Sequence, residues 1–254
     1  MTIEVLFTPA DFGALKARAL EGTCAVVFDV FRATTSMVTA LANGATAVVP
    51  VVDIPDALVL HRSNPAVLLA GERQGVRIRA SVSGGTDFHL GNSPREFTRD
   101  RVEGRTIVMT TTNGTRALRA CAHADAVWVA SFLNLRAVAD AILRRRPGKL
   151  LVVCSGTFEE AALEDVLGAG ALCSLLAGHA NGGLSDSALI ALDAYAAAEG
   201  DLLRAASRSR NGRRLLANPD LREDVAFCLQ RDVFDFAAAL DAEGVVRRVR
   251  IGED

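Results

Sequence analysis

Several classes of protein are excluded by what this sequence of 254 residues lacks. Lysine and arginine together number 28 against 30 aspartates and glutamates, so no basic excess favours a nucleic acid or a membrane surface. No apolar run approaches the roughly 20 residues that span a bilayer. The opening segment MTIEVLFTPADF has no basic start followed by an apolar stretch, so no signal peptide is visible. We therefore expect a cytoplasmic protein with neither membrane nor nucleic-acid partners.

Familiar catalytic and metal-binding patterns are also missing. The five cysteines form no CxxC pair, which argues against a disulfide framework, and the four histidines have no metal-like spacing. The GxxxxGK[ST] loop, the GxSxG elbow and the DxDx[TV] segment of aspartyl-phosphate phosphatases are absent. Cys154 ends a predicted strand, but Glu160 stands where a cysteine phosphatase would have its arginine. If this protein acts on phosphate groups, it must use a different set of catalytic residues from those of these known families.

Short β-branched segments alternate with alanine- and leucine-rich helical patterns along the chain. This alternation is typical of an α/β protein, and we predict a three-layer α/β/α fold with a largely parallel or mixed central sheet. No linker divides the sequence, so we predict one domain, 1–254. The predicted strands are Ile3–Phe7, Cys24–Phe28, Ala47–Val52, Val67–Ala70, Thr106–Met109, Ala126–Ala130, Leu150–Cys154 and Val245–Ile251. The predicted helices are Thr34–Ala42, Thr115–Ala122, Arg136–Arg145, Leu163–Ala177, Ser185–Ser207 and Leu221–Phe227.

A polar loop follows the second predicted strand, where open α/β sheets bind ligands. Asp29 ends the strand, Arg32 lies in the turn, and Thr34 or Thr35 can cap the next helix. A carboxylate there can hold a divalent cation, and an arginine offers forked donors to a phosphate or sulfonate. Free N–H groups at a helix start also favour an anion. The structural alternative is a capped turn with an Asp29–Arg32 ion pair.

A second loop of this kind follows the predicted strand Thr106–Met109. Hydroxyls, an amide and a glycine crowd the point between strand and helix, where they can donate to an oxyanion. The alternative is an ordinary helix cap, which explains only one or two of the hydroxyls. The loop consists of Thr110, Thr111, Thr112, Asn113, Gly114 and Thr115.

Other polar groups near predicted strand or helix ends have weaker individual signals. Glu72 and Arg73 follow a strand, although a surface ion pair would explain them equally well. Glu164 and Asp165 begin a helix, where the macrodipole favours acids and where magnesium would find hard oxygen ligands. Asp224 is either a further ligand or a surface acid. The remaining candidates are Asn92 and Ser93, in the long polar segment 76–105 that we expect to be a functional or disordered loop, and Ser155 and Gly156 at a strand end.

Seven short motifs follow one another in order along most of the chain. They are Asp29-Val30-Phe31-Arg32-Ala33-Thr34-Thr35, Ala40-Leu41-Ala42-Asn43-Gly44-Ala45, Gly71-Glu72-Arg73, Leu90-Gly91-Asn92-Ser93-Pro94, Thr110-Thr111-Thr112-Asn113-Gly114-Thr115, Cys154-Ser155-Gly156, and Leu163-Glu164-Asp165 with Ala169-Gly170. Each motif is weak alone, but their order makes chance implausible. In these segments the chain resembles the 2-phosphosulfolactate phosphatase (ComB) family.

The resemblance implies a magnesium-dependent phosphatase that converts 2-phospho-3-sulfolactate to 3-sulfolactate and phosphate, a step towards coenzyme M. On this hypothesis Mg²⁺ takes its ligands, directly or through water, from Asp29, Glu72, Glu164 and Asp165. Arg32, Arg73 and the loop 110–115 hold the anionic groups of the substrate. Asp29 could instead act as base or nucleophile, and these roles stay open. The binding residues that the motifs supply are Thr34, Thr35, Asn92, Ser93, Thr111, Thr112, Asn113, Gly114, Thr115, Ser155 and Gly156.

The sequence departs from the family pattern in places. Phe31 stands where leucine is frequent, and the segment before Leu90 is shifted, which puts the role of Asp87 in doubt. The stretch around Asp224 is a loose match. Two alternatives therefore remain: a phosphatase of another small phosphorylated hydroxy acid, and a non-catalytic anion-binding protein on the same scaffold. A homodimer is the default expectation for assembly.

Overall fold

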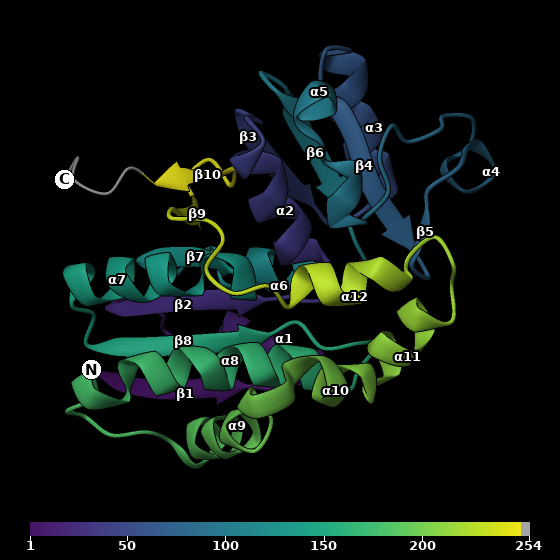
Figure 1. Cartoon of the computed structure of the whole chain (residues 1–254). Coiled ribbons are helices and arrows are strands. Elements are labelled where there is room, and N and C mark those ends of the chain that lie inside the picture. The colour runs from purple at the N-terminus through teal and green to yellow at the C-terminus, as the bar shows by residue number, and fades with distance from the viewer. Residues whose placement is uncertain (250–254) are drawn as a thin grey trace.

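A ten-stranded mixed sheet forms the centre of the computed structural model, which describes residues 1–249 (Figure 1). The strand order is β1-β8-β2-β7-β9-β10-β3-β6-β4-β5. The strands are β1 Thr2–Leu6, β2 Thr23–Phe28, β3 Ala47–Val51, β4 Leu68–Arg73, β5 Val76–Arg77, β6 Thr106–Thr110, β7 Ala126–Ala130, β8 Lys149–Cys154, β9 Ala237–Leu240 and β10 Val246–Val249.

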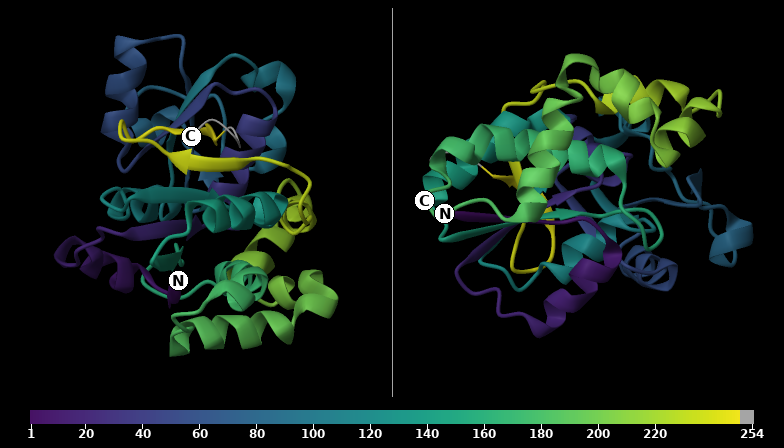
Figure 2. Two further views of the ribbon diagram at one scale, coloured as in Figure 1. Left: turned by 90° about the vertical axis from the view of Figure 1, so that its left-hand side faces the viewer. Right: turned by 90° about the horizontal axis from the view of Figure 1, so that it is seen from below.

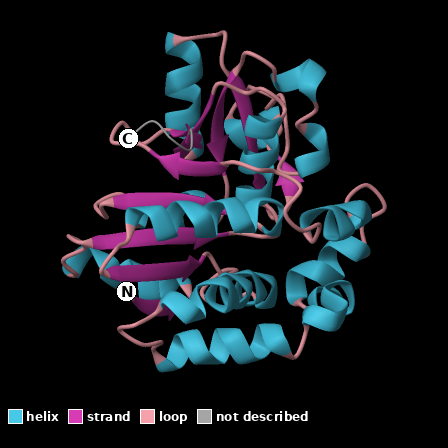
Figure 3. Cartoon of the chain, turned by 60° about the vertical axis from the view of Figure 1, so that its left-hand side comes forward, coloured by secondary structure: helices cyan, strands magenta, loops and turns pink. Residues whose placement is uncertain are grey.

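Helices cover both faces of this sheet, as Figures 2 and 3 show. They are α1 Pro9–Gly13, α2 Ala33–Ala42, α3 Ile54–Ser63, α4 Ala80–Ser83, α5 Arg99–Val102, α6 Gly114–Ala120, α7 Leu135–Arg145, α8 Leu163–Leu176, α9 Asp186–Ala196, α10 Leu202–Ser207, α11 Arg210–Leu216 and α12 Arg222–Cys228. The predicted three-layer α/β/α fold is confirmed. Within residues 1–249, every helix is too short or too polar to cross a bilayer.

The sheet consists of two sets of parallel strands joined by an antiparallel hairpin. Strands β1, β8, β2 and β7 form one set, and β3, β6 and β4 form the other. Between them, β9 pairs with β7, and β10 pairs with β9 and β3, all antiparallel. The two sets run in different directions, and their carboxyl ends meet near α12 and β5 (Figure 1). Loops from both sets can therefore contribute to one site.

Strand β2 shows how the layers are held together. Its residues Cys24, Val26 and Phe28 pack with α7 and α8 on one face, whereas Ala25 and Val27 pack with α1, α2 and α6 on the other. All six residues of β2 are buried. A parallel strand that is covered on both faces has an uninterrupted apolar sequence, and this is why the segment was recognisable as a strand. Because β2 is packed on both faces, it holds in place the loop that begins at its carboxyl end.

Every predicted strand is present, although the last two residues of the predicted strand 245–251 lie outside the described part of the chain. The predicted single helix Ser185–Ser207 is wrong, because α9 ends before Gly200 and α10 begins after it. Asp201 caps α10 by accepting a hydrogen bond from Arg204 N at 3.0 Å. The other predicted helices are confirmed with small shifts of their ends.

The segment 76–105 is more ordered than a long loop. It contains β5, α4, a 3₁₀ turn at Pro94–Glu96 and α5. Its apolar residues Phe88, Leu90 and Phe97 are buried, and Leu90 N donates to Leu69 O on β4 at 3.0 Å. This packing holds the segment against the second set of strands. Elements that the sequence did not indicate are α1, α3, α4, α5, α11, β5 and β9.

Candidate active site

A cavity of about 210 Å³ lies where the loops after β2, β4, β6 and β8 meet α11. Its lining includes residues from most of the polar segments that the sequence singled out. The predicted residues in its wall are Asp29, Arg32, Glu72, Arg73, Asn92, Thr112, Asn113 and Gly156. Residues from four separate strand ends are thus brought together as expected from the topology. The wall also contains Phe31, Gln74, Gly75, Thr157, Phe158, Asn211 and Arg214, which sequence reasoning missed as site residues.

Asp29 directly follows β2, and its position is fixed by the first turn of α2. Asp29 Oδ1 accepts a hydrogen bond from Ala33 N at 3.0 Å, and Thr34 N donates to Asp29 O at 3.1 Å. On the other side, Gly114 lies so close that a Cβ there would be 2.6 Å from Asp29 Oδ2. Only glycine allows this approach of the second loop, so the two polar loops meet at the Asp29 carboxylate.

The environment of Asp29 makes it easier to protonate than an ordinary aspartate. The pKa of Asp29 is raised from 3.8 to about 6, mainly by burial and also by the nearby carboxylates of Glu72 and Glu164, against the lowering effect of the Ala33 N–H. A carboxyl group with a pKa near neutrality, in a cavity, is suited to taking up and releasing protons.

Glu72 links the end of β4 to the second polar loop. Its Oε1 accepts hydrogen bonds from Thr112 N at 2.9 Å and Thr112 Oγ1 at 2.8 Å, while its Oε2 accepts from Gly75 N at 2.6 Å. The neighbouring Arg73 donates to Thr110 Oγ1 at 3.0 Å and to its neighbour's carbonyl, Glu72 O, at 2.7 Å. The guanidinium of Arg73 therefore directs its hydrogen bonds at the protein itself. Burial also lowers the pKa of Arg73.

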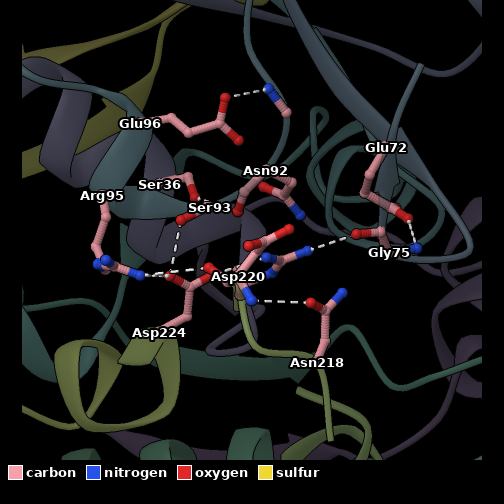
Figure 4. Close-up of polar contacts among 12 residues, drawn as sticks. Ser36, Glu72, Gly75, Asn92, Ser93, Arg95, Glu96, Asn218, Asp220 and Asp224 are labelled. Atoms are coloured by element: carbon pink, nitrogen blue, oxygen red, sulfur yellow. Dashed lines mark hydrogen bonds and ion pairs between the residues drawn. The ribbon is translucent and has the colours of Figure 1, made fainter. Parts of the chain in front are cut away.

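Arg32 forms a buried ion pair that the sequence did not indicate. Its Nη1 lies 2.7 Å from Asp224 Oδ2 on α12, and its Nη2 donates to Gly75 O at 3.0 Å. Ser93 Oγ donates to Asp224 Oδ1 at 2.7 Å (Figure 4). Of the two alternatives for Asp224, the surface acid is wrong, because Asp224 is fully buried. The ion-pair partner of Arg32 is therefore Asp224 and not Asp29.

Glu164 and Asp165 lie buried in the first turn of α8. Asp165 Oδ1 accepts from Val30 N at 2.8 Å, and its Oδ2 accepts from Ser155 Oγ and Gly156 N, each at 3.1 Å. Burial raises the pKa of both acids, and the nearby Asp29 raises that of Asp165 further. Asp165 does not line the cavity. Its hydrogen bonds tie the loop after β2 to the loop after β8.

The four predicted metal ligands do not converge into one direct ligand set. Within residues 1–249, no three acidic, histidine or cysteine side chains lie close enough to share an ion. The reason is visible in the contacts: Asp165 and Glu72 direct their oxygens at main-chain and hydroxyl donors. Magnesium, however, commonly takes only one or two carboxylates and completes its shell with water and substrate phosphate.

The oxygens available at the cavity fit such an ion. Asn92 Oδ1 and Asn113 Oδ1 are buried without a hydrogen-bond partner in the described chain, and both residues line the cavity. Glu164 Oε2 is likewise buried and without a partner. Unpaired buried oxygens are costly unless a ligand or water satisfies them. Asn92, Asn113 and Asp29 thus offer hard oxygens in the cavity wall, the kind that magnesium prefers, whereas Glu164 lies outside the lining.

Comparison with known proteins identifies the family of the chain. The family model for 2-phosphosulpholactate phosphatase matches residues 12–243. The chain belongs to this family. A protein of Symbiobacterium thermophilum named "Probable 2-phosphosulfolactate phosphatase" is 41% identical over 84% of this chain and 89% of its own. Proteins with the same name in Clostridium perfringens strain SM101 and Thermotoga maritima are 38% and 36% identical, covering 92% and 87% of this chain and 92% and 90% of their own.

The family is one of phosphoric monoester hydrolases, and the predicted resemblance is confirmed. Several of its motif residues nevertheless hold the loops in place without lining the cavity. Thr35 Oγ1 donates to Val30 O at 3.0 Å, and Thr115 Oγ1 donates to Thr111 O at 3.1 Å. Asp87 accepts from Ala80 N at 2.7 Å, which places it at the start of α4. The predicted residues outside the lining are Thr34, Thr35, Ser93, Thr111, Gly114, Thr115, Ser155, Glu164 and Asp165.

Helix α11 supplies the part of the site that no family motif in the sequence pointed to. Asn211 Nδ2 donates to Thr157 Oγ1 and to Glu164 Oε1, each at 2.6 Å, and so anchors α11 to the loop after β8. Arg214, one turn further, also lines the cavity and is exposed to solvent. The stretch around α11 is rich in arginine, and neither periodicity nor spacing marks it as part of a site.

Proposed function

We propose that this chain hydrolyses 2-phospho-3-sulfolactate to 3-sulfolactate and phosphate with the help of Mg²⁺. The observation that carries the proposal is the buried Asp29 carboxylate in the wall of the cavity, flanked by Glu72 and by the loop at Gly114. The family and the names of its members supply the reaction class and the substrate. The resemblance also implies the coenzyme M pathway as the destination of the product.

The negative charges at the cavity favour the binding of a cation. Asp29 and Glu72 both line it, and a phosphate ester that enters would meet two carboxylates. Like charges in a partly buried site repel strongly unless a cation lies between them. Because the Glu72 oxygens already accept hydrogen bonds from the chain, we propose that Glu72 holds the ion through water, with the Asn92 and Asn113 oxygens available to that water. Asp29 then stays free to act as the base. When bound there, magnesium would neutralise phosphoryl oxygens and lower the pKa of a coordinated water.

Asp29 is the group best placed to handle the proton of the attacking water. With a pKa of about 6 it is mostly ionised at neutral pH, so it can accept a hydrogen bond and then a proton from water. As the new P–O bond forms, the bond from phosphorus to the ester oxygen breaks, and the alcohol takes up a proton on leaving. The hydrogen bond from Ala33 N holds Asp29 Oδ1 in place during this step.

Phosphate release from racemic 2-phospho-3-sulfolactate, measured with Mg²⁺ and with EDTA, tests the proposal. We expect turnover that requires the metal and far exceeds turnover of 2-phosphoglycerate and 2-phospholactate. Equal turnover of all three would retain the phosphatase activity and remove the specific substrate. No release from any of them would favour an anion-binding protein on this scaffold. A cytoplasmic location and a homodimer also stay predictions, to be tested by cell fractionation and by size-exclusion chromatography with light scattering.

A further inference from the structure

Three arginines line the cavity, and the guanidinium groups of two of them donate hydrogen bonds to the protein itself. Arg32 donates to Asp224 and to Gly75 O. Arg73 donates to the Thr110 hydroxyl and to main-chain carbonyls. A guanidinium that is already paired offers few directed donors to a ligand, because its five N–H groups lie in a fixed plane. The third arginine, Arg214, is different.

Arg214 lies on α11 at the exposed side of the cavity. Within residues 1–249, its guanidinium makes neither a hydrogen bond nor an ion pair. It lies against the turn between β4 and β5, since a Cβ at Gly75 would be only 2.7 Å from Arg214 Nη2. The same turn carries the Gly75 N–H that donates to Glu72 and the Gly75 carbonyl that accepts from Arg32. An arginine with free donors is therefore held beside the proposed catalytic groups.

The substrate under the proposed function carries three acidic groups, of which two share one carbon. Its phosphate ester and its carboxylate are attached to C2, whereas its sulfonate is one carbon further away. Asp29 and Glu72 are buried, so the phosphate belongs at the inner part of the cavity, and the more distant sulfonate extends towards the exposed side. Arginine suits a sulfonate because the planar fork matches two oxygens and is weakly hydrated.

We propose that Arg214 binds the sulfonate and selects the substrate among small phosphate esters, an inference that rests on the proposed function. Its neighbour Arg213 provides the contrast. Arg213 is also exposed on α11, but it does not line the cavity, and its Nη1 donates to Arg208 O. Two adjacent arginines on one helix thus differ in whether they line the cavity, which makes Arg213 a matched control for Arg214.

The test is a comparison of two substrates in three proteins. We expect Arg214→Ala to lower kcat/KM for 2-phospho-3-sulfolactate by about 10- to 100-fold, the range of a charge-assisted hydrogen bond. The same variant should change kcat/KM for 2-phospholactate, which lacks the sulfonate, by less than about threefold. The control Arg213→Ala should change neither. An equal loss on both substrates, or no loss on either, would overturn the assignment.

A binding measurement tests the role of Arg214 without relying on the proposed hydrolysis. Isothermal titration calorimetry with 3-sulfolactate and with lactate compares ligands that differ only in the sulfonate. We expect the wild-type chain to prefer 3-sulfolactate and Arg214→Ala to lose that preference. A preference that survives in Arg214→Ala, or that is absent from the wild type, would refute the role of Arg214. An inactive wild type that still shows the Arg214-dependent preference would refute only the proposed hydrolysis.

Discussion

Arg32 Nη1 and Asp224 Oδ2 lie 2.7 Å apart, although the two residues are 192 positions apart in the sequence. The Arg32 side chain is 4% exposed and that of Asp224 is 0% exposed. The contact joins the loop after β2 to α12, and Ser93 joins it from a third segment (Figure 4). The ion pair is therefore a structural part of the cavity wall, and its removal should affect folding as well as activity.

We expect Asp224→Asn to lower the free energy of unfolding by about 3 kcal/mol or more, because it leaves the Arg32 charge buried and unpaired. Urea denaturation measures this directly. The matched control is Glu223→Gln, whose side chain is 68% exposed and pairs with Arg95 on the surface. It should change stability by no more than about 1 kcal/mol.

Removal of both charges separates the two roles of Arg32. Arg32→Met combined with Asp224→Leu should be less destabilised than the sum of the single variants, since no charge is left unpaired. The double variant should still lose about two or more decades of kcat/KM, as we expect for Arg32→Ala. Near-wild-type turnover in the double variant would show that Arg32 acts only through the fold.

Asp29→Asn should lower kcat by at least about 100-fold with Mg²⁺ present, because the amide cannot accept the proton of the attacking water. The fold should be retained, since an amide oxygen can still accept the hydrogen bond from Ala33 N. Asp87→Asn is the control, because Asp87 lies outside the cavity wall and only caps a turn. Activity of Asp29→Asn close to that of Asp87→Asn would contradict the proposed mechanism.

The raised pKa of Asp29 also predicts how stability depends on pH in EDTA. The folded state binds this proton more tightly than the unfolded state, so the contribution of Asp29 is greatest below pH 3.8 and declines as pH rises to about 6. The two-unit shift corresponds to a decline of about 3 kcal/mol. The variant Asp29→Asn has no carboxyl group at this position, so its free energy of unfolding does not show this decline. We expect urea denaturation from pH 4 to 7 to show the variant gaining stability relative to the wild type, and parallel curves would contradict the shift.

Gly114→Ala tests the close contact between the two polar loops. Alanine at the start of a helix is normally tolerated or slightly stabilising. Here its Cβ would lie 2.6 Å from Asp29 Oδ2 and 2.7 Å from Ala33 Cβ, so the Asp29 carboxylate must move. We expect kcat/KM to fall by about 100-fold or more, since displacement of a reacting group by about 1 Å has that effect. Gly200→Ala, where nothing lies within 4 Å, should leave activity unchanged.

The parts of the fold that follow from local signals were predictable from the sequence. Apolar strands such as β2 are recognisable because they are buried on both faces, and parallel strands place their polar loops at one edge. Asp29, Glu72 and Asn113 were found in this way, as polar residues at or just after strand ends. The shared direction of β4 and β6 brings Glu72 and Asn113 to one edge, whereas their meeting with Asp29, which follows β2 of the other set, depends on how the hairpin of β9 and β10 joins the two sets.

The remaining parts depend on contacts that have no local signal. Strand β9 has the sequence Ala-Ala-Ala-Leu, without the β-branched residues that mark a strand, and it forms only because β7 and β10 pair with it. The partnership of Arg32 with Asp224 is equally invisible, because the side chains meet only after the whole chain has folded. Arg214 lies on a short arginine-rich helix whose position is set by Asn211 at its other end.

The hairpin of β9 and β10 is the only bridge between the two parallel sets in the described sheet, and it lies at residues 237–249. While the chain is being translated, β7 and β3 therefore keep open edges until this segment has left the ribosome. Open strand edges pair readily with other chains. Until residues 237–249 are available, these two edges can therefore pair with strands of other chains, so partly synthesised or C-terminally truncated chains should aggregate more readily than the full one.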